Sequence, residues 1–300
     1  MKILNFGSLN LDYVYAVDHM VQPGETLAAS TMETFCGGKG LNQSIALARA
    51  GAEVYHAGLI GEEGEILRKA VADSGADTSC IETIAGKSGH TIIQVDQNGQ
   101  NCILLYGGAN RSVTREFVDR VISKFDRGDI LLLQNEINEL SYIIDKAYER
   151  GLEIILNPSP YDQNLEGCDF GKISMFLLNE IEGEQITGVC KPEEILDELK
   201  ERFPGVKVVL TLGGQGAVYQ DQERCCRQGI YQVEAVDTTG AGDTFTGYFI
   251  ASMLQGEEPQ QCLTLAAKAS AIAVSRAGAA PSIPEREEVL HTDLAEKKEI

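Results

Sequence analysis

Strand-like and helix-like runs alternate along most of this 300-residue chain, and this alternation restricts its fold more than any other feature. Apolar strand patterns at 53–58, 129–134 and 152–156 alternate with helical patterns at 62–74 and 140–149. Consecutive parallel strands need crossover helices, so the pattern predicts an α/β fold with a doubly wound, mainly parallel sheet flanked by helices. Three further runs fit strands of the same sheet: 2–6, 174–178 and 207–212.

Two segments interrupt this alternation. Alternating runs at 91–96 and 101–106 flank Gln-Asn-Gly-Gln at 97–100, in which Asn-Gly indicates a hairpin turn. Residues 13–35 have the composition of short strands outside the main sheet. We interpret the two parts, about 12–35 and 90–107, as a small β-sheet that covers a cleft as a lid, with a plain edge hairpin as the alternative. The sequence shows no interdomain linker, so a single domain over 1–300 is expected.

Composition excludes several classes of protein. At 43% hydrophobic the chain can bury a substantial core, and its net charge of −20 argues against nucleic acid or an anionic membrane as partner. No window is long and apolar enough to span a bilayer, and the N-terminus leads into a strand-like run instead of a signal peptide. Eight cysteines without a CxxC pair argue against a zinc site or a disulfide framework, so a cytoplasmic location is expected.

A glycine turn near the C-terminus is the strongest candidate for chemistry. A strand-like run at 230–236 precedes it, and a helical pattern follows it. Amide groups at a helix start lack intrahelical partners, and Gly240 and Gly242 have no Cβ, so an anion could approach the amides of Gly240, Ala241 and Gly242 closely. Asp243 beside this anion hole could take a proton from an attacking hydroxyl during phosphoryl transfer. The alternative is an ordinary acidic residue at a helix start.

A second glycine turn and several polar residues at strand ends support a binding cleft. Gly-Gly-Lys-Gly at 37–40 runs into a helical pattern at 44–50, but its spacing is not that of a Walker A loop. Polar side chains follow the strand ends, where ligands gather in open α/β sheets. Each of them singly also has an ordinary explanation. Turn chemistry would explain Asn10 and Asp12, a helix cap Asn179, an acidic residue in a first helical turn Glu182, and a solvated loop Glu136.

Together the two turns resemble a known family. Asp-Thr-Thr-Gly-Ala-Gly-Asp at 237–243 resembles the C-terminal signature of the ribokinase/phosphofructokinase-B family of carbohydrate kinases, and 37–40 resembles its N-terminal signature. The likeness covers roughly 1–290. Four further segments resemble the ribokinase branch in particular: 7–12, 107–110, 157–160 and 211–216. The resemblance implies ATP-dependent phosphorylation of a sugar's primary hydroxyl, which gives D-ribose 5-phosphate if the sugar is ribose.

The resemblance also implies roles for individual residues. Asp243 would be the catalytic base, and the amides of 240–242 the anion hole. The positions that would contact the sugar are Asn10, Asp12, Gly38, Lys39, Asn42, Glu136 and Asp243. Those on the ATP side would be Asn179, Thr211, Gly213 and Gly216, with Glu182 in the region of Mg²⁺. A monovalent cation, usually K⁺, would lie at Asp237, Thr239, Ala273, Arg276, Gly278 and Ser282.

Departures from the family pattern leave the substrate open. Tyr106 stands where close ribokinases often have histidine, and Thr91 stands where a smaller residue is common. A kinase for another sugar, a sugar acid or a nucleoside is therefore the main alternative. A catalytically silent sugar-binding protein is the second, and the presence of Asp243 with both glycines argues against it. The resemblance further implies a homodimer formed through the lid.

Overall fold

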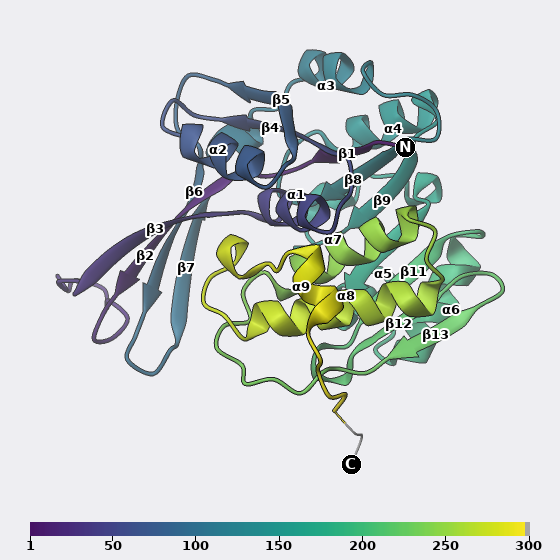
Figure 1. The fold of residues 1–300 in the computed structure, drawn as a ribbon. Helices are drawn as coiled ribbons and strands as arrows, with labels where there is room; N and C mark the ends of the chain where they lie inside the picture. The colour runs from purple at the N-terminus through teal and green to yellow at the C-terminus, as the bar shows by residue number, and fades with distance from the viewer. Residues whose placement is uncertain (298–300) are drawn as a thin grey trace.

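The computed structural model describes residues 1–297, and its main feature is a nine-stranded sheet (Figure 1). The strands lie in the order β13-β12-β11-β10-β9-β8-β1-β4-β5, and pairing is parallel from β11 to β5. The antiparallel strands β12 and β13 complete one edge. The bounds are β1 Ile3–Phe6, β4 Val54–Ile60, β5 Asp77–Thr83, β8 Ile130–Gln134, β9 Glu153–Asn157, β10 Met175–Asn179, β11 Lys207–Thr211, β12 Ala217–Gln220 and β13 Cys225–Gln228.

Helices cover both faces of this sheet. They are α1 Lys39–Arg49, α2 Glu65–Asp73, α3 Arg115–Ile122, α4 Leu140–Arg150, α5 Glu180–Thr187, α6 Pro192–Arg202, α7 Ala241–Leu254, α8 Pro259–Val274 and α9 Arg286–His291. Successive residues of a strand point to opposite faces, so Ile3 packs with α1, α7 and α8 while Leu4 packs with α3 and α4. The central strands β1 and β8 are buried at every position, as expected for a parallel sheet between two helical layers. Within the described range, no helix is long and apolar enough to cross a membrane.

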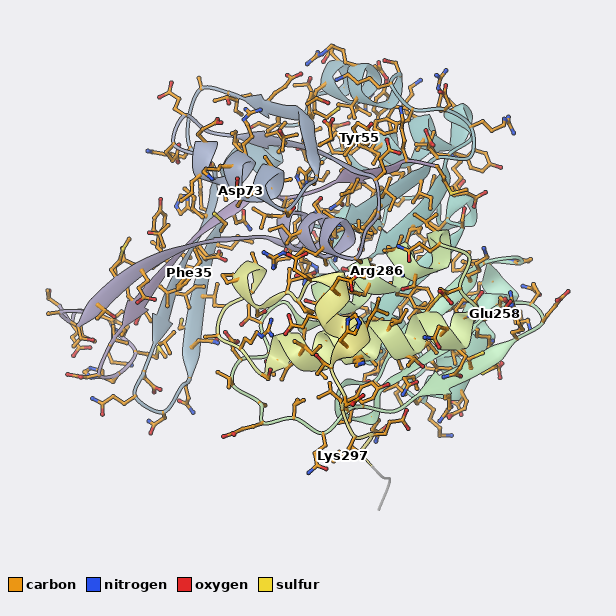
Figure 2. All side chains as sticks on the ribbon, viewed as in Figure 1. Phe35, Tyr55, Asp73, Glu258, Arg286 and Lys297 are labelled. Atoms are coloured by element: carbon orange, nitrogen blue, oxygen red, sulfur yellow. The ribbon has the colours of Figure 1, made fainter. Side chains whose placement is uncertain are left out.

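A second, four-stranded sheet projects away from the main sheet, and its strand β3 still contacts α2, where Cys36 Sγ donates to Ile66 O (Figures 1 and 2). Its order is β3-β2-β6-β7, from β2 Asn10–Ala16, β3 Thr31–Gly37, β6 Gly89–Val95 and β7 Asn101–Tyr106. These are the two segments that the sequence separates from the main sheet. Because β2 begins only three residues after β1 ends, the small sheet starts directly at the carboxyl edge of the main sheet.

The structure differs from the sequence prediction in several elements. The run at 230–236 is not a strand: Tyr231 makes an isolated bridge to Glu296, and Val236 N–H donates to Val274 O on α8. The β12–β13 hairpin already closes this edge of the sheet, so the run packs along the C-terminal part of the chain. The helix expected at 44–50 begins earlier, at Lys39. The sequence patterns also missed three strands: the seven-residue β5 and the four-residue β12 and β13.

Candidate active site

Two helix N-termini converge at the carboxyl ends of the central strands. α1 begins after Gly38 and α7 after Gly240, and the two helices pack closely, since a Cβ on Gly247 would lie 2.4 Å from the Ala46 Cβ. The end of β1 meets α1 equally closely, because a Cβ on Gly7 would lie 2.6 Å from the Gly40 Cα. Both N-termini carry partial positive charge, so this junction is suited to a phosphate group.

Asp243 lies at the centre of this junction, in the first turn of α7, and is only 7% exposed. Its Oδ2 accepts a hydrogen bond from Asn42 Nδ2 at 3.0 Å, and its Oδ1 accepts one from Gln43 Nε2 at 2.9 Å. Asn42 Oδ1 is buried and has no hydrogen-bond partner among residues 1–297, so it is available to a ligand hydroxyl. Sequence reasoning missed Gln43, although its position next to Asn42 in the second glycine turn was a signal.

One amide of the predicted anion hole, that of Ala241, already donates a hydrogen bond within the protein. Gly240 adopts the left-handed conformation (φ 75°), and the Ala241 N–H donates to Thr238 O at 3.2 Å. A Cβ on Gly242 would meet no atom within 4 Å, which places open space directly beside the helix start. Gly242 therefore leaves room for a ligand, whereas Gly240 shapes the turn.

Lys39, the first residue of α1, lines the same cavity as Asp243, and its backbone contacts Glu136. Glu136 Oε2 accepts hydrogen bonds from the Lys39 backbone N–H at 2.9 Å and from Ser8 Oγ, so it fixes the start of α1. Burial alone would lower the pKa of the Lys39 amine. Neighbouring carboxylates outweigh burial and raise that pKa, and they belong to Asp243, Glu136 and Glu182. Lys39 therefore stays positively charged, and a phosphate site requires a positive charge.

Asn10 and Asp12 extend this polar region onto the small sheet. Asn10 Oδ1 accepts from Asn110 Nδ2 at 2.7 Å, and Asp12 Oδ1 accepts from Thr91 Oγ1 at 2.5 Å. Burial raises the pKa of Asp12, the bond from Thr91 opposes this, and the charge of Glu136 adds to it. Of these residues, sequence reasoning had not assigned Asn110 a role, although it lies in a segment that resembles ribokinases.

The predicted nucleotide residues line two adjoining cavities. One, of about 410 Å³, has Thr211, Gly213 and Gly216 on one side and apolar side chains such as Val233 and Phe245 on the other. The second, of about 230 Å³, is more polar and is lined by Lys39, Asn179, Glu182 and Asp243 among others. Thr211, Thr238 and Gly242 line both cavities. An apolar chamber joined to a polar one suits a base linked to phosphates.

Asn179 and Glu182 are also structural residues of α5. Asn179 Oδ1 accepts from the Glu182 N–H at 2.9 Å, and Glu182 Oε2 accepts from the Asn179 N–H at 3.0 Å, which is a complete capping box. The buried Glu182 carboxylate is thus fixed at the edge of the polar cavity.

The predicted cation residues come together only in part. Asp237 Oδ1 accepts from Thr239 N–H and Oγ1, and its Oδ2 accepts from Gly278 N–H at 2.9 Å. Burial opposes ionisation of Asp237, but these bonds lower its pKa overall. The Arg276 side chain instead pairs with Glu288. Two other predicted positions serve the local turn: Ala273 O accepts from the Arg276 N–H, and Ser282 Oγ donates to Ala279 O.

No group of three or more His, Cys, Asp or Glu side chains within residues 1–297 is arranged to hold a metal ion.

The fold and the site define an α/β small-molecule kinase, with a carboxylate at a helix N-terminus between a polar and an apolar cavity. Comparison with known proteins gives the family: residues 1–286 match the pfkB family of carbohydrate kinases, and the chain belongs to it. A ribokinase of Haemophilus influenzae is 33% identical over 297 residues, which is 95% of either chain.

Two solved structures are similar over nearly their whole length. A ribokinase of Thermotoga maritima matches with a TM-score of 0.86 and 32% identity, covering 97% of this chain and 98% of that one. A ribokinase of Arabidopsis thaliana, solved with ribose and ATP, matches with a TM-score of 0.84 and 29% identity. The match covers 96% of this chain and 97% of that one. These likenesses agree with the sheet order and confirm the α/β prediction.

Proposed function

We propose that this chain is an ATP-dependent ribokinase that phosphorylates the primary hydroxyl of D-ribose to give D-ribose 5-phosphate. The observation that carries the proposal is the position of the Asp243 carboxylate at the start of α7. The side-chain amides of Asn42 and Gln43 on α1 hold it there, and it lines the polar cavity together with Lys39 and Glu182. Family membership supplies the reaction class, and the similarity to ribokinases favours ribose as the acceptor.

The polar side chains around Asp243 are suited to a neutral sugar. A sugar presents many hydroxyls and no charge, so it is held by oriented donors and acceptors. Asn10, Asp12, Asn42 and Glu136 supply these groups, with Gly38 and Lys39 beside them, and the free Asn42 Oδ1 is an acceptor ready for one hydroxyl. Since Asn10 and Asp12 lie on β2, we assign the small sheet the role of a lid on a single kinase domain, which excludes water from the reaction.

The transfer step needs positioning and charge stabilisation more than covalent chemistry. The hydroxyl oxygen attacks the γ-phosphorus of ATP while Asp243 accepts the hydroxyl proton. The bond between the γ-phosphorus and the bridging oxygen breaks, and ADP leaves with the electron pair. The amides at Gly240–Gly242 and the start of α7 stabilise the charge on the transferring group. ATP would fit with its base in the larger cavity, which Gly213 and Gly216 line together with apolar side chains, and with its phosphates in the polar cavity near Asn179 and Thr211.

Two kinds of cation fit residues of this chain. Magnesium bound with ATP would lie near Glu182, whose carboxylate is fixed at the polar cavity, and when bound it offsets phosphate charge. A monovalent cation, K⁺ by preference, would be held where Asp237 joins the loop at Thr239 to the turn at Gly278. Asp237 stays ionised there, so it offers the negative charge that a cation requires.

We also propose that two copies pair through the small sheet. Four consecutive residues of β7, from Ile103 to Tyr106, are each more than half exposed, and an unpaired edge strand with apolar side chains is normally covered by a partner. Sedimentation should therefore give a dimer for the wild type and a monomer for Leu104→Asp, whereas Leu290→Asp on α9 should stay dimeric. A monomeric wild type would refute this pairing.

A cytoplasmic location is part of the same proposal. ATP is made available there, and all eight cysteines are free thiols, which suits a reducing compartment. Localisation of a tagged full-length chain would test it directly.

The decisive experiment is ADP release from ATP and Mg²⁺ with D-ribose, deoxyribose, fructose, sugar acids and nucleosides, each with and without K⁺. Strongest turnover on D-ribose is expected, and K⁺ should stimulate it. Asp243→Ala should lower kcat by about 10²–10⁴-fold, the usual contribution of a positioned acid–base group, while the exposed Asp73→Ala is the matched control with unchanged kcat. Preference for another acceptor would reassign the substrate, and near-normal turnover of Asp243→Ala would remove its role as base.

A further inference from the structure

A continuous chain of buried amide side chains leads from Asp243 into the protein. Gln43 Nε2 donates to Asp243 Oδ1 at 2.9 Å, and Gln43 Oε1 accepts from Gln134 Nε2 at 2.7 Å. Gln134 Nε2 also donates to Asn5 Oδ1 at 2.9 Å. Gln43 is 1% exposed, and Gln134 and Asn5 are 0% exposed. The three amides come from α1, β8 and β1, so the chain connects the central strands to the two converging helices.

A backbone carbonyl sets the direction of this chain. Asn5 Nδ2 donates to Gly40 O at 2.7 Å, and a carbonyl oxygen can only accept. Asn5 must therefore turn its NH₂ group toward Gly40 and its oxygen toward Gln134. Gln134 must then present its NH₂ group, so Gln43 must face Gln134 with its oxygen. Gln43 is left with its NH₂ group pointing at Asp243. None of the three side-chain amides can exchange the positions of its oxygen and nitrogen without losing a buried hydrogen bond.

We propose that Gln43 is a positioning residue for phosphoryl transfer, and that Gln134 and Asn5 hold its amide in the one orientation that donates to Asp243. The inference rests on the proposed role of Asp243 as base. It assigns function to two glutamines and an asparagine that neither the sugar nor the nucleotide has to touch.

The physical effect follows from burial. Asn42 holds one oxygen of Asp243 and Gln43 holds the other, so the plane of the carboxylate is fixed relative to the polar cavity. A reversed Gln43 amide would place its oxygen against the carboxylate at a site from which water is excluded, and the repulsion would be strong there. Correct orientation of the Gln43 amide therefore stops the carboxylate from rotating away from the acceptor hydroxyl.

The test compares Gln43→Leu and Gln134→Met with wild type by steady-state kinetics on D-ribose across pH. Each variant keeps approximate volume and removes the hydrogen bonds. We expect kcat to fall about 10- to 100-fold, the usual cost of a lost bond to a charged group, with KM values for sugar and ATP nearly unchanged. The acidic limb of the kcat–pH profile should move to higher pH in Gln43→Leu, which removes the donor to the carboxylate, and less far in Gln134→Met, which removes only the partner that orients this donor. Gln220→Met is the matched control, a partly buried glutamine on β12 away from the site, and it should behave as wild type.

The outcomes separate the inference from the proposed function. Wild-type kcat and an unmoved acidic limb in folded Gln43→Leu and Gln134→Met would overturn the inference. A fall in thermal stability alone, with both readouts unchanged, would also overturn it, since the role would then be purely structural. Near-normal turnover of Asp243→Ala would instead remove Asp243 from the role of base, on which the inference rests, and a folded wild type without turnover on any acceptor would overturn the proposed function itself. If Gln43→Leu does not fold, Gln43→Met, with an unbranched side chain of similar length, provides the same readouts.

Discussion

Burial of His56 makes this protein's stability depend on pH in a way that can be calculated. His56 is 0% exposed in β4, and its Nδ1 lies 2.8 Å from Ser44 Oγ. Burial lowers the pKa of His56 from 6.5 to about 4, with only partial opposition from the backbone of Gly7. The folded protein therefore keeps this imidazole neutral at a pH where the unfolded chain would protonate it.

The sign and size of the effect follow from linkage. Above pH 6.5 both states carry a neutral His56, so the residue does not affect the pH dependence. Between pH 6.5 and 4 only the unfolded chain takes up the proton, so the free energy of unfolding falls as the pH falls. A difference of 2.5 pKa units corresponds to a total loss of about 3 kcal/mol, of which about 2 kcal/mol is lost between pH 7.5 and 5.0.

Urea unfolding of wild type and His56→Phe at pH 7.5 and pH 5.0, under reducing conditions, measures this contribution. Phenylalanine keeps the ring and cannot titrate, so the loss of stability on acidification should be about 2 kcal/mol smaller in the variant. His291→Gln, which changes an exposed histidine, should keep the wild-type pH dependence. Equal losses in wild type and His56→Phe would refute the reasoning, whatever the absolute stability of the variant.

Three further substitutions test separate parts of the site. Thr91→Val removes the bond to Asp12 that favours its ionised form, so the acidic limb of kcat/KM for ribose should move to higher pH; an unmoved limb would contradict this. Gly216→Ala should lower the free energy of unfolding by about 2 kcal/mol or more in urea titration, because φ is +93° there and the new Cβ would lie 1.9 Å from Gln228 O. Glu182→Gln keeps an acceptor for its capping bond but loses its charge, so the melting temperature should hold while half-maximal activity needs several-fold more Mg²⁺; an unchanged Mg²⁺ requirement would exclude Glu182 from the metal region.

Local patterns in the sequence were enough to predict the layered α/β architecture. Strand and helix periods are properties of short windows, so the alternation from residue 53 onward predicts parallel strands with crossover helices. The two glycine turns could also be predicted from the sequence, because the features of such a turn lie within a few residues of one another. In the second turn these are Gly240, Gly242 and Asp243. The position of Asp243 beside Asn42 still had to come from the resemblance to a family, since the two lie 201 residues apart.

Elements of weak local pattern were decided by tertiary context. The run at 230–236 is apolar enough for a strand, yet the β12–β13 hairpin occupies the sheet edge and the run packs on α8 instead. The sequence pattern also gave no partner for the Arg276 side chain, which the tertiary structure pairs with Glu288 on α9.

The sequence by itself predicted the two glycine turns and the acidic residue that follows the second of them, because residue type and local spacing indicate where a helix begins and what its first turn presents. Only the tertiary structure decided how those residues are oriented. The amide chain from Asn5 through Gln134 to Gln43 joins positions more than ninety residues apart, and its direction follows from one buried carbonyl at Gly40. Hydrogen-bond direction depends on which donors and acceptors meet in space, and that information is absent from any window of the sequence.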